Sequence, residues 1–218
     1  MKIVAPHLLK LLKKKPNLDE LSNRLFQLGH EHEIEGEILD LEITPNRGDC
    51  LSLKGIARDL NYFYESISDQ DIYTDQIPKL DLKFKNQAKD ICPNISFLEL
   101  EIDGKIGDYK PYLENYFTDL SINKNNFFTD ISNYLAYETG QPTHCFDAMK
   151  MQGEFALIKR NKSEKFQTLL NTEVELEGEN LVFTLNDQLI SLAGVMGGAS
   201  TSCDDKTNKV LIECAYFR

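Results

Sequence analysis

The sequence has no apolar run that approaches the roughly 20 residues needed to span a bilayer, so we expect no membrane segment. It has no C-x-x-C pair either, and its five cysteines are odd in number and widely spread. This pattern argues against a disulfide framework and a zinc site, and it favours a reducing compartment. We therefore expect no metal. The first residues are weakly signal-like, but their lysines follow the apolar residues, so we expect mature sequence there.

Positive charge is scarce: 24 lysines and arginines stand against 35 aspartates and glutamates, which gives a formal net charge of −11. A protein that binds nucleic acid usually carries a basic face. The main basic run here consists of Lys10, Lys13, Lys14 and Lys15. Composition alone therefore ranks RNA binding low. A chain that acted on RNA would need most of its phosphate affinity to come from another source.

The amino-terminal part, residues 1–66, is expected to be a small helix–strand–helix unit. Asn17 and Glu20 form the pattern of a capping box, and leucines at helical spacing follow until a glycine ends the helix. Alternating apolar and acidic residues predict a strand near Leu39–Ile43. Asp49 is expected to cap the second helix.

The rest of the chain is expected to be a linker and a second domain. Residues 67–90 are polar and have little period, which is typical of a linker. Residues 91–218 contain short apolar runs that predict strands, with helices expected after Pro111 and over Ser132–Tyr137. Asn186-Asp187 resembles a two-residue hairpin turn. The second domain should therefore be β-rich with helices packed on it, and the fold class is α+β.

The first segment that could carry chemistry is Thr44–Ser52, TPNRGDCLS, between a strand and a helix. Gly48 frees the backbone, and Arg47 could pair with a carboxylate or with a phosphate. Turn chemistry explains most of these residues, so a structural role is favoured.

The second segment, Ser132–Asp147, ends a helix at Gly-Gln-Pro and places a histidine just beyond the turn. The turn could bring Asn133, Gln141 and His144 together. A catalytic role and a simple hydrogen bond to a neighbouring carbonyl are equally favoured by the spacing, because a lone histidine needs a partner to act.

The last two segments are a glycine-rich run and a carboxylate within an apolar strand. Leu192–Gly198, LAGVMGG, has three glycines that would let a backbone approach a ligand, although tight turn packing explains them equally well. It is neither a Walker A loop nor a G-x-G-x-x-G motif. Glu213 in VLIECA either points to solvent or faces a pocket, where its burial would cost several kcal/mol without a partner such as a ligand hydroxyl.

Taken in order, TPNRGDCLSLKGIARDL, SNYLAYETGQPTHCFD, LAGVMGG and LIECAYF resemble the β-subunit of bacterial phenylalanyl-tRNA synthetases. The usual forms in that family are TPNR-D-LS--GIARE, TNY---E-GQP-HAFD, LAGVMGG and a strand carrying E-A-F. The match extends over nearly the whole chain, and the pair of GQP-HxFD and LAGVMGG is highly specific. The chain is thus similar to the amino-terminal part of that subunit.

The resemblance implies that the segment from about residue 90 onward is an editing domain, which hydrolyses the ester of mischarged Tyr-tRNA(Phe). It implies that Glu213 binds the tyrosine hydroxyl, and that the catalytic residues His144 and Asn133 position substrate and water. The other substrate-binding residues that it implies are Ala193, Gly194, Met196, Ser132, Gln141 and Pro142.

The resemblance also implies partners and a location. The partners are tRNA(Phe), the synthetase α-subunit and the remaining β-subunit domains, and the location is the cytoplasm. ATP and Mg would belong to the catalytic α-subunit, so we expect no cofactor in this chain and no aminoacylation by it alone. Two alternatives stay open: a non-catalytic structural or tRNA-positioning module of the same synthetase, and a free-standing amino-acid-binding protein.

The chain departs from the family pattern in several places. The family generally has an oligonucleotide-binding domain between the first helix and the TPNR strand, whereas Glu33–Ile43 joins the two directly here. The family's Arg-Tyr pair after the cysteine that corresponds to Cys92 is replaced by Pro93-Asn94-Ile95-Ser96, which calls into question an arginine contact near the editing site. Ser132 replaces a usual threonine and keeps the hydroxyl.

Overall fold

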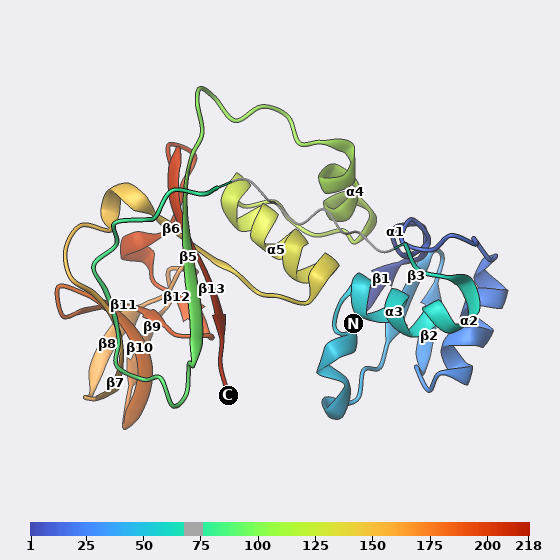
Figure 1. Cartoon of the computed structure of the whole chain (residues 1–218), viewed down its shortest axis with the longest axis horizontal. Helices are drawn as coiled ribbons and strands as arrows, with labels where there is room; N and C mark the ends of the chain where they lie inside the picture. The colour runs from blue at the N-terminus through green and yellow to red at the C-terminus, as the bar shows by residue number, and fades with distance from the viewer. Residues whose placement is uncertain (68–75) are drawn as a thin grey trace. The chain divides into compact units, whose positions relative to one another are not determined.

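The computed structural model describes residues 1–67 and 76–218, whose helices and strands are drawn in Figure 1. The chain divides into two compact units, and both contain helices and strands, which confirms the α+β class. Unit 1 comprises Met1–Gln76, Asp108–Lys124 and Asn133–Gln141. Unit 2 comprises Ile77–Gly107, Asn125–Ser132 and Pro142–Arg218. None of the described helices is both long enough and apolar enough to cross a membrane.

Unit 1 contains a three-stranded antiparallel sheet in the order β1-β3-β2 (Figure 1). Helices precede and follow its strands in the sequence. The strands are β1 (Lys2–Val4), β2 (His32–Glu35) and β3 (Ile38–Leu41), and the first three helices are α1 (Ala5–Leu9), α2 (Leu18–Gln27) and α3 (Leu53–Tyr64). The capping box is confirmed, because the Asn17 side chain accepts a 2.9 Å hydrogen bond from the Glu20 N–H. The β2–β3 turn at Gly36, whose φ is +62°, makes the direct connection that the sequence indicates.

The cap of α3 differs from the expected one. Ser52, and not Asp49, accepts the hydrogen bond from the N–H of Gly55, at 3.0 Å. Asp49 lies inside the 3-10 helix η1 (Pro45–Cys50), and its carboxylate is paired with two arginines instead. Both residue types suit a helix N-terminus, so the arginine partners decide which of them is free to cap.

Two helices from the middle of the chain contribute to unit 1, namely α4 (Pro111–Asp119) and the second part of α5 (Phe127–Thr139). The helix expected after Pro111 is confirmed, and the one expected over Ser132–Tyr137 is part of the longer α5. The Tyr137 hydroxyl accepts a 3.2 Å hydrogen bond from the Val4 N–H, and His7 Nε2 lies 3.0 Å from Asp119 Oδ2. This division differs from the expected boundaries, which placed all of residues 91–218 in one domain.

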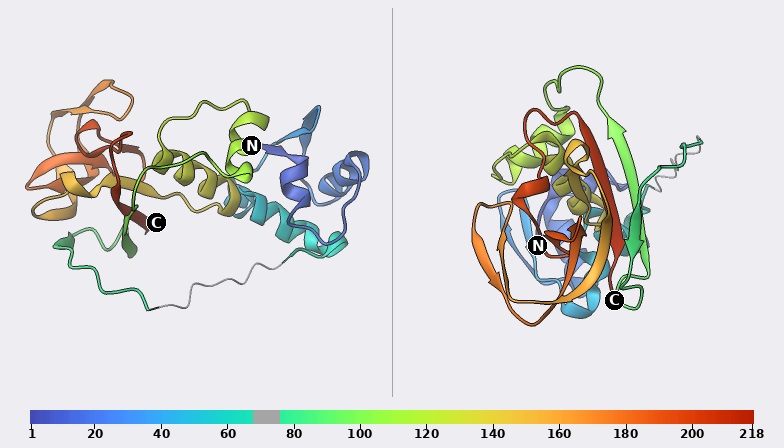
Figure 2. Two further views of the ribbon diagram at one scale, coloured as in Figure 1. Left: turned by 90° about the horizontal axis from the view of Figure 1, so that it is seen from above. Right: turned by 90° about the vertical axis from the view of Figure 1, so that its left-hand side faces the viewer.

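Unit 2 contains two larger sheets and a small hairpin (Figures 1 and 2). The five-stranded sheet has the order β12-β11-β10-β7-β4, and the three-stranded sheet has the order β5-β13-β6. The strands of the first are β4 (Phe84–Asn86), β7 (Phe155–Asn161), β10 (Glu179–Leu185), β11 (Gln188–Leu192) and β12 (Met196–Gly197). Those of the second are β5 (Asn94–Glu101), β6 (His144–Asp147) and β13 (Lys209–Tyr216). The hairpin pairs β8 (Glu164–Gln167) with β9 (Glu173–Leu176).

Strands of both sheets supply the core of unit 2. Phe146 and Leu211 come from the three-stranded sheet, and Phe155 and Phe183 come from the five-stranded one; all four are almost fully buried. The expected Asn186-Asp187 turn is confirmed, because both residues have positive φ between β10 and β11, as a type I′ hairpin requires.

The segment expected to be a linker is only partly one. Its residues 68–75 lie outside the described part of the chain. Further along, β4 pairs in parallel with β7, so Phe84–Asn86 belongs to the five-stranded sheet. The aromatic ring of Phe84 lies 5.0 Å from that of Phe155, centroid to centroid, which explains why this short polar stretch is held in unit 2.

Candidate functional site

A cavity of about 230 Å³ lies within unit 2, and three segments form its wall. They are the start of β6 with the residues before it, the β11–β12 hairpin, and the end of β13 with the residue after it. Its volume is below the ~300–1,000 Å³ that is usual for small-molecule sites, so it suits one side chain of a ligand. The lining residues are Pro142, Thr143, His144, Ser191, Leu192, Gly194, Val195, Met196, Gly197, Glu213, Ala215 and Phe217.

Strand β13 presents Glu213 and Ala215 to the cavity because alternate residues of a strand share a face. Phe217, two residues further on, continues this series. His144 on β6 is the direct cross-strand partner of Glu213. The pairing therefore brings together the histidine and the carboxylate that the sequence singled out, although 69 residues separate them along the chain.

Glu213 is 7% exposed, and its carboxyl makes no hydrogen bond or ion pair with any side chain that the structure describes. Loss of hydration disfavours its charged form, which raises the pKa of the carboxyl to about 7. A buried carboxyl without a partner is costly unless a ligand donates a hydrogen bond to it. The cavity wall therefore offers a hydrogen-bond acceptor.

His144 is also shifted by burial, which lowers its pKa to about 4. The imidazole is thus neutral at pH 7. Its Nε2 atom is buried and has no hydrogen-bond partner among the described residues. The ring packs edge-on against Phe146, with the centroids 4.4 Å apart.

The β11–β12 hairpin needs its glycines for packing as well as for any ligand. Gly194 has a φ of +71°, and a Cβ there would lie 3.2 Å from the ring of Phe217. A Cβ on Gly197 would collide with the imidazole of His144. A Cβ on Gly198 would collide with the carbonyl of Ile190. The glycine-rich run Leu192–Gly198 is therefore tightly packed, and it also lines the cavity, so both interpretations of its glycines hold.

A pair of hydroxyls lies beside the cavity. Ser132 on α5 donates to the carbonyl of Thr143 at 2.6 Å, and its Oγ lies 2.7 Å from the Thr143 hydroxyl. Asp147, the last residue of the same motif, accepts hydrogen bonds from Thr207 at 2.9 Å and from the Met149 N–H at 3.0 Å. Ser132 thus supports the cavity wall, and Asp147 holds the end of β6.

The family model that matches residues 104–218, more than half of the chain, describes a B3/4 domain. This chain belongs to the B3/4-domain family. Its motifs GQPTHCFD, LAGVMGG and LIECAYF all lie inside the matched region, and they supply most of the cavity wall.

The resemblance to phenylalanyl-tRNA synthetase β-subunits is confirmed by relatives of known name. The phenylalanine–tRNA ligase β subunit of Psychrobacter arcticus is 31% identical over 193 residues, which cover 84% of this chain and 24% of the relative. That of Oceanobacillus iheyensis is 36% identical over 189 residues, which cover 83% of this chain and 23% of the relative. The B3/4 chain thus spans about a quarter of the length of these relatives.

A solved structure also aligns with this B3/4 chain. It is an amino-terminal fragment of the phenylalanyl-tRNA synthetase β-subunit from Pyrococcus horikoshii, with 17% identity and a TM-score of 0.48, and the alignment covers 100% of this chain and 68% of that one.

The B3/4 cavity brings together some of the residues chosen from the sequence and not others. Gly194, Met196 and Pro142 line it together with His144 and Glu213. Ala193 does not line it, because its side chain is buried in the core of unit 2. Asn133 and Gln141 are exposed, belong to unit 1 and are not among the lining residues.

Seven further residues line the B3/4 cavity that the sequence did not single out individually: Thr143, Ser191, Leu192, Val195, Gly197, Ala215 and Phe217. The last two could have been found by counting alternate positions from Glu213 along its strand. The Ser191 hydroxyl donates to the carbonyl of Met196 at 3.2 Å, and so it holds the hairpin closed.

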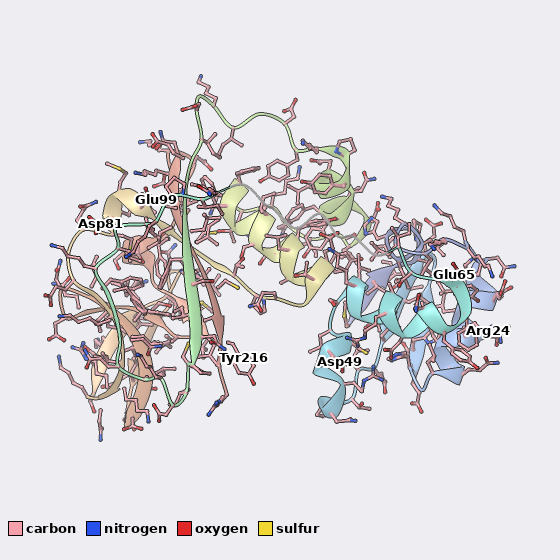
Figure 3. All side chains as sticks on the ribbon, in the orientation of Figure 1. Arg24, Asp49, Glu65, Asp81, Glu99 and Tyr216 are labelled. Atoms are coloured by element: carbon pink, nitrogen blue, oxygen red, sulfur yellow. The ribbon has the colours of Figure 1, made fainter. Side chains whose placement is uncertain are left out.

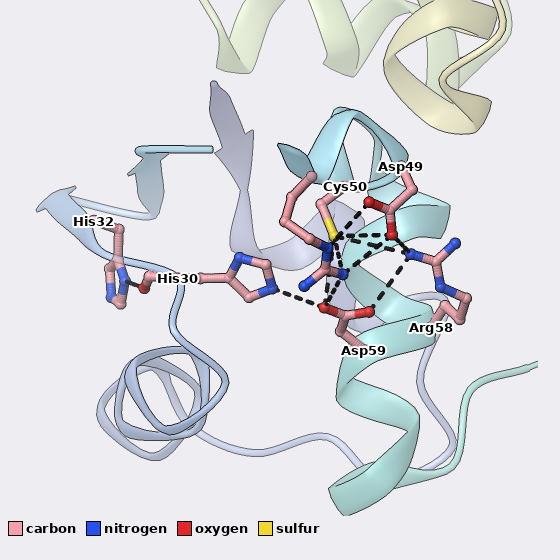
Figure 4. A network of polar contacts seen from close by, with 7 residues as sticks. His30, His32, Asp49, Cys50, Arg58 and Asp59 are labelled. Atoms are coloured by element: carbon pink, nitrogen blue, oxygen red, sulfur yellow. Dashed lines mark hydrogen bonds and ion pairs between the residues drawn. The ribbon is translucent and has the colours of Figure 1, made fainter. Parts of the chain in front are cut away.

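The TPNRGDC segment forms a separate polar network in unit 1 (Figure 4). Arg47 Nη2 lies 2.6 Å from Asp59 Oδ2 and 2.7 Å from Cys50 Sγ, and His30 Nε2 lies 3.0 Å from the same Asp59 oxygen. His30, Cys50 and Asp59 have ligand atoms close enough to hold a metal ion. The guanidinium of Arg47 lies against two of these three groups, and burial raises the pKa of the Cys50 thiol to about 11. The three groups are therefore better suited to binding the guanidinium of Arg47 than to binding a metal ion.

Arg47 could pair with a carboxylate or with a phosphate. Its guanidinium is paired with Asp49 and Asp59, which together raise its pKa. An arginine that is already paired with two carboxylates is poorly available to a phosphate. The structural reading of this segment is therefore the one that the contacts support.

Proposed function

We propose that this chain is an editing module, part of a phenylalanine–tRNA ligase β subunit, that hydrolyses the ester of mischarged Tyr-tRNA(Phe). The observation that carries the proposal is the unpartnered, buried carboxyl of Glu213 in a cavity sized for one side chain. The location of GQPTHCFD, LAGVMGG and LIECAYF around that cavity supports it, as do the names of the relatives.

Glu213 reads the substrate by its hydrogen bond to the tyrosine hydroxyl. Tyrosine differs from phenylalanine by that hydroxyl, and a synthetase pocket built for phenylalanine cannot reject the addition strongly. A second site that hydrogen-bonds the hydroxyl can reject phenylalanine well, because phenylalanine leaves the buried carboxyl without a partner. Gly194 and Met196 form the wall beside the aromatic ring.

The reaction adds water across the ester. The water oxygen attacks the carbonyl carbon, the bond to the ribose oxygen breaks, and the water proton passes to that ribose oxygen. The products are free tyrosine and tRNA with a free terminal hydroxyl. His144 has a pKa too low for an efficient general base at pH 7, so its role is to hold the ester and the water in place by hydrogen bonding.

Asn133 and Gln141 do not line the cavity, and the proposal assigns them to the part of the substrate outside it. They follow Ser132 and precede Pro142 in the same motif, and they would contact the ester or the terminal adenosine. Ser132 and Pro142 would position the chain around the ester, while Ala193 would support the hairpin from the core side.

The proposed partners are tRNA(Phe), the synthetase α-subunit and the remaining β-subunit domains, and the proposed location is the cytoplasm. Hydrolysis needs only water, so no cofactor is required in this chain. ATP and Mg would act with the catalytic α-subunit during aminoacylation.

The test is to mix the purified chain with Tyr-tRNA(Phe) and, separately, with Phe-tRNA(Phe), and to follow the loss of labelled amino acid. Selective loss of tyrosine is the expected result. If neither ester is lost, the same assay is repeated at a chain concentration that saturates tRNA in a mobility-shift experiment. Binding without turnover at that concentration would contradict the editing proposal.

The replacement of the family's Arg-Tyr pair after Cys92 and the net charge of −11 both argue against catalysis on tRNA and favour a second candidate, a non-catalytic structural or tRNA-positioning module of the same synthetase. Binding without turnover would support this candidate. A third, a free-standing amino-acid-binding protein, would show tight tyrosine binding that tRNA does not change.

A further inference from the structure

Phe217 lies in the cavity wall two residues beyond Ala215 and four beyond Glu213. It is half-buried, and one part of its ring faces Gly194, where a Cβ would come within 3.2 Å of it. The backbone just after it is fixed, because the Arg218 N–H donates to the Ile91 carbonyl at 2.8 Å. Gly194 therefore lies against the ring, and a hydrogen bond holds the backbone beside it.

The spacing of residues in an extended chain limits the distance between the ring of Phe217 and the carboxyl of Glu213, which is proposed to bind the tyrosine hydroxyl. Alternate residues of an extended chain are ~6.6 Å apart, so Phe217, one residue beyond the end of β13, lies at most ~13 Å from Glu213 along the chain. A tyrosyl side chain is about as long as two strand residues, ~6.6 Å. A tyrosyl group whose hydroxyl meets Glu213 thus ends near Ala215, and whatever is esterified to it comes next.

The charge of the chain limits what else can hold that esterified group. Acidic side chains outnumber basic ones and give a net charge of −11, so contacts that do not depend on charge gain weight. Stacking of a base on an aromatic side chain is such a contact, and it is sequence-tolerant and strong.

We propose that Phe217 stacks against the base of the terminal nucleoside to which the amino acid is esterified. This inference rests on the proposed function, since it assumes an aminoacyl nucleoside in the cavity. Three alternate residues, Glu213, Ala215 and Phe217, then contact different parts of the substrate. Glu213 reads the amino acid, Ala215 leaves room for the aromatic ring and the ester, and Phe217 binds the base.

The test uses two non-hydrolysable probes and isothermal titration calorimetry on the full chain. One probe is tyrosinamide, and the other is 3′-amino-3′-deoxyadenosine that carries tyrosine through an amide bond. Phe217→Leu keeps an apolar side chain but removes the ring, and Phe217→Tyr keeps the ring. Tyr216→Leu is the matched control, because Tyr216 is the neighbouring aromatic residue, is 58% exposed and does not line the cavity.

The wild-type chain is expected to bind the adenosine probe more tightly than tyrosinamide. Phe217→Leu should weaken binding of the adenosine probe roughly 5- to 150-fold, the range of one base stacked on an aromatic side chain, and should leave tyrosinamide binding unchanged. Phe217→Tyr and Tyr216→Leu should bind both probes as the wild type does.

Three results would overturn the base contact: no preference of the wild type for the adenosine probe, an equal loss of both probes in Phe217→Leu, or no loss of either. An equal loss would show that the ring packs against the tyrosyl group or only supports the wall. Because the probes cannot be hydrolysed, the outcome is separate from that of the editing assay. A chain that binds the adenosine probe through Phe217 but leaves Tyr-tRNA(Phe) intact would contradict editing alone.

Discussion

His144 and Glu213 lie directly opposite each other on the antiparallel strands β6 and β13, and burial shifts their pKa values in opposite directions. The pKa of the histidine falls to about 4, and that of the carboxyl rises to about 7. Both groups are therefore neutral between about pH 4 and pH 7, and they do not form an ion pair there. Their neutrality leaves each free to bond to a ligand.

These shifts act on stability with opposite signs. The raised pKa of Glu213 contributes stability that is fully present below 4.5, its unperturbed value, and is lost as the pH rises through about 7. The lowered pKa of His144 contributes stability that is present above 6.5 and is lost as the pH falls toward 4. The two effects oppose each other between pH 4.5 and pH 6.5.

Glu213→Gln should therefore raise the free energy of unfolding at pH 8, by about 2–4 kcal/mol, because the wild type must keep a charged carboxyl buried there. At pH 4 the two proteins should be equally stable, since the wild-type carboxyl is then neutral. Urea unfolding at both pH values measures the difference. Equal stabilities at pH 8 would mean that Glu213 is hydrated in solution.

Glu213→Ala should weaken the preference for Tyr-tRNA(Phe) over Phe-tRNA(Phe) by about 1–3 kcal/mol, the cost of an unpaired buried partner. The ratio of kcat/KM for the two esters measures it. Tyr216→Leu, a change next to the cavity face of the same strand, should keep the wild-type ratio. Full discrimination by the alanine variant would show that Glu213 does not read the hydroxyl.

His144→Ala should slow hydrolysis while leaving the fold largely intact, because the imidazole positions the ester and the water. Titration of His144 should not change the wild-type rate near pH 6.5, because burial lowers its pKa to about 4, and a change near pH 7 would instead report the carboxyl of Glu213, whose pKa burial raises to about 7. Single-turnover assays between pH 5 and pH 8 check both points, with urea unfolding as the control for folding. An unchanged rate in the variant would remove His144 from the mechanism.

Local patterns in the sequence predicted local structure well. The leucine spacing and the Asn17 cap located α2, and the paired asparagine and aspartate located the β10–β11 turn. The cap of α3 was wrong because Asp49 and Ser52 are both good caps, and only the positions of Arg47 and Arg58 show which of them is occupied.

Long-range organisation could not be predicted in the same way. The periodicity of α4 and α5 indicates that one face is buried, but not which unit buries it. That choice depends on contacts such as the one between Val4 and Tyr137, which are 133 residues apart. Among the candidate site residues, Ala193 and Gly194 are neighbours, yet one faces the core and the other lines the cavity. Backbone turns of this kind are not readable from composition.

Gly197→Ala should reduce hydrolysis by displacing His144, because the added Cβ would collide with the imidazole. Overpacking of this kind typically costs about 1–3 kcal/mol of stability. Gly107→Ala is the matched control, since no atom lies within 4 Å of the Cβ that it would gain. Hydrolysis and urea unfolding are measured for both variants. A Gly197 variant with wild-type activity and stability would mean that the hairpin and His144 can separate at no cost.

Asp59→Ala should destabilise unit 1 far more than Asp49→Ala does. Figure 4 labels both residues, and Figure 3 also labels Asp49. The side chain of Asp59 is 15% exposed and pairs with Arg47, Arg58 and His30, so its removal leaves an arginine and a histidine without their buried partner. A loss of about 2–4 kcal/mol is expected. The side chain of Asp49 is 44% exposed, and its arginine pairs are screened by solvent, so its removal should cost little stability. Urea unfolding measures both losses, and hydrolysis measured in parallel tests the role of the segment. Asp49→Ala frees Arg47 and Arg58 from one carboxylate and should leave the rate of hydrolysis unchanged. A lower rate without loss of stability would mean that the TPNRGDC segment takes part in binding tRNA.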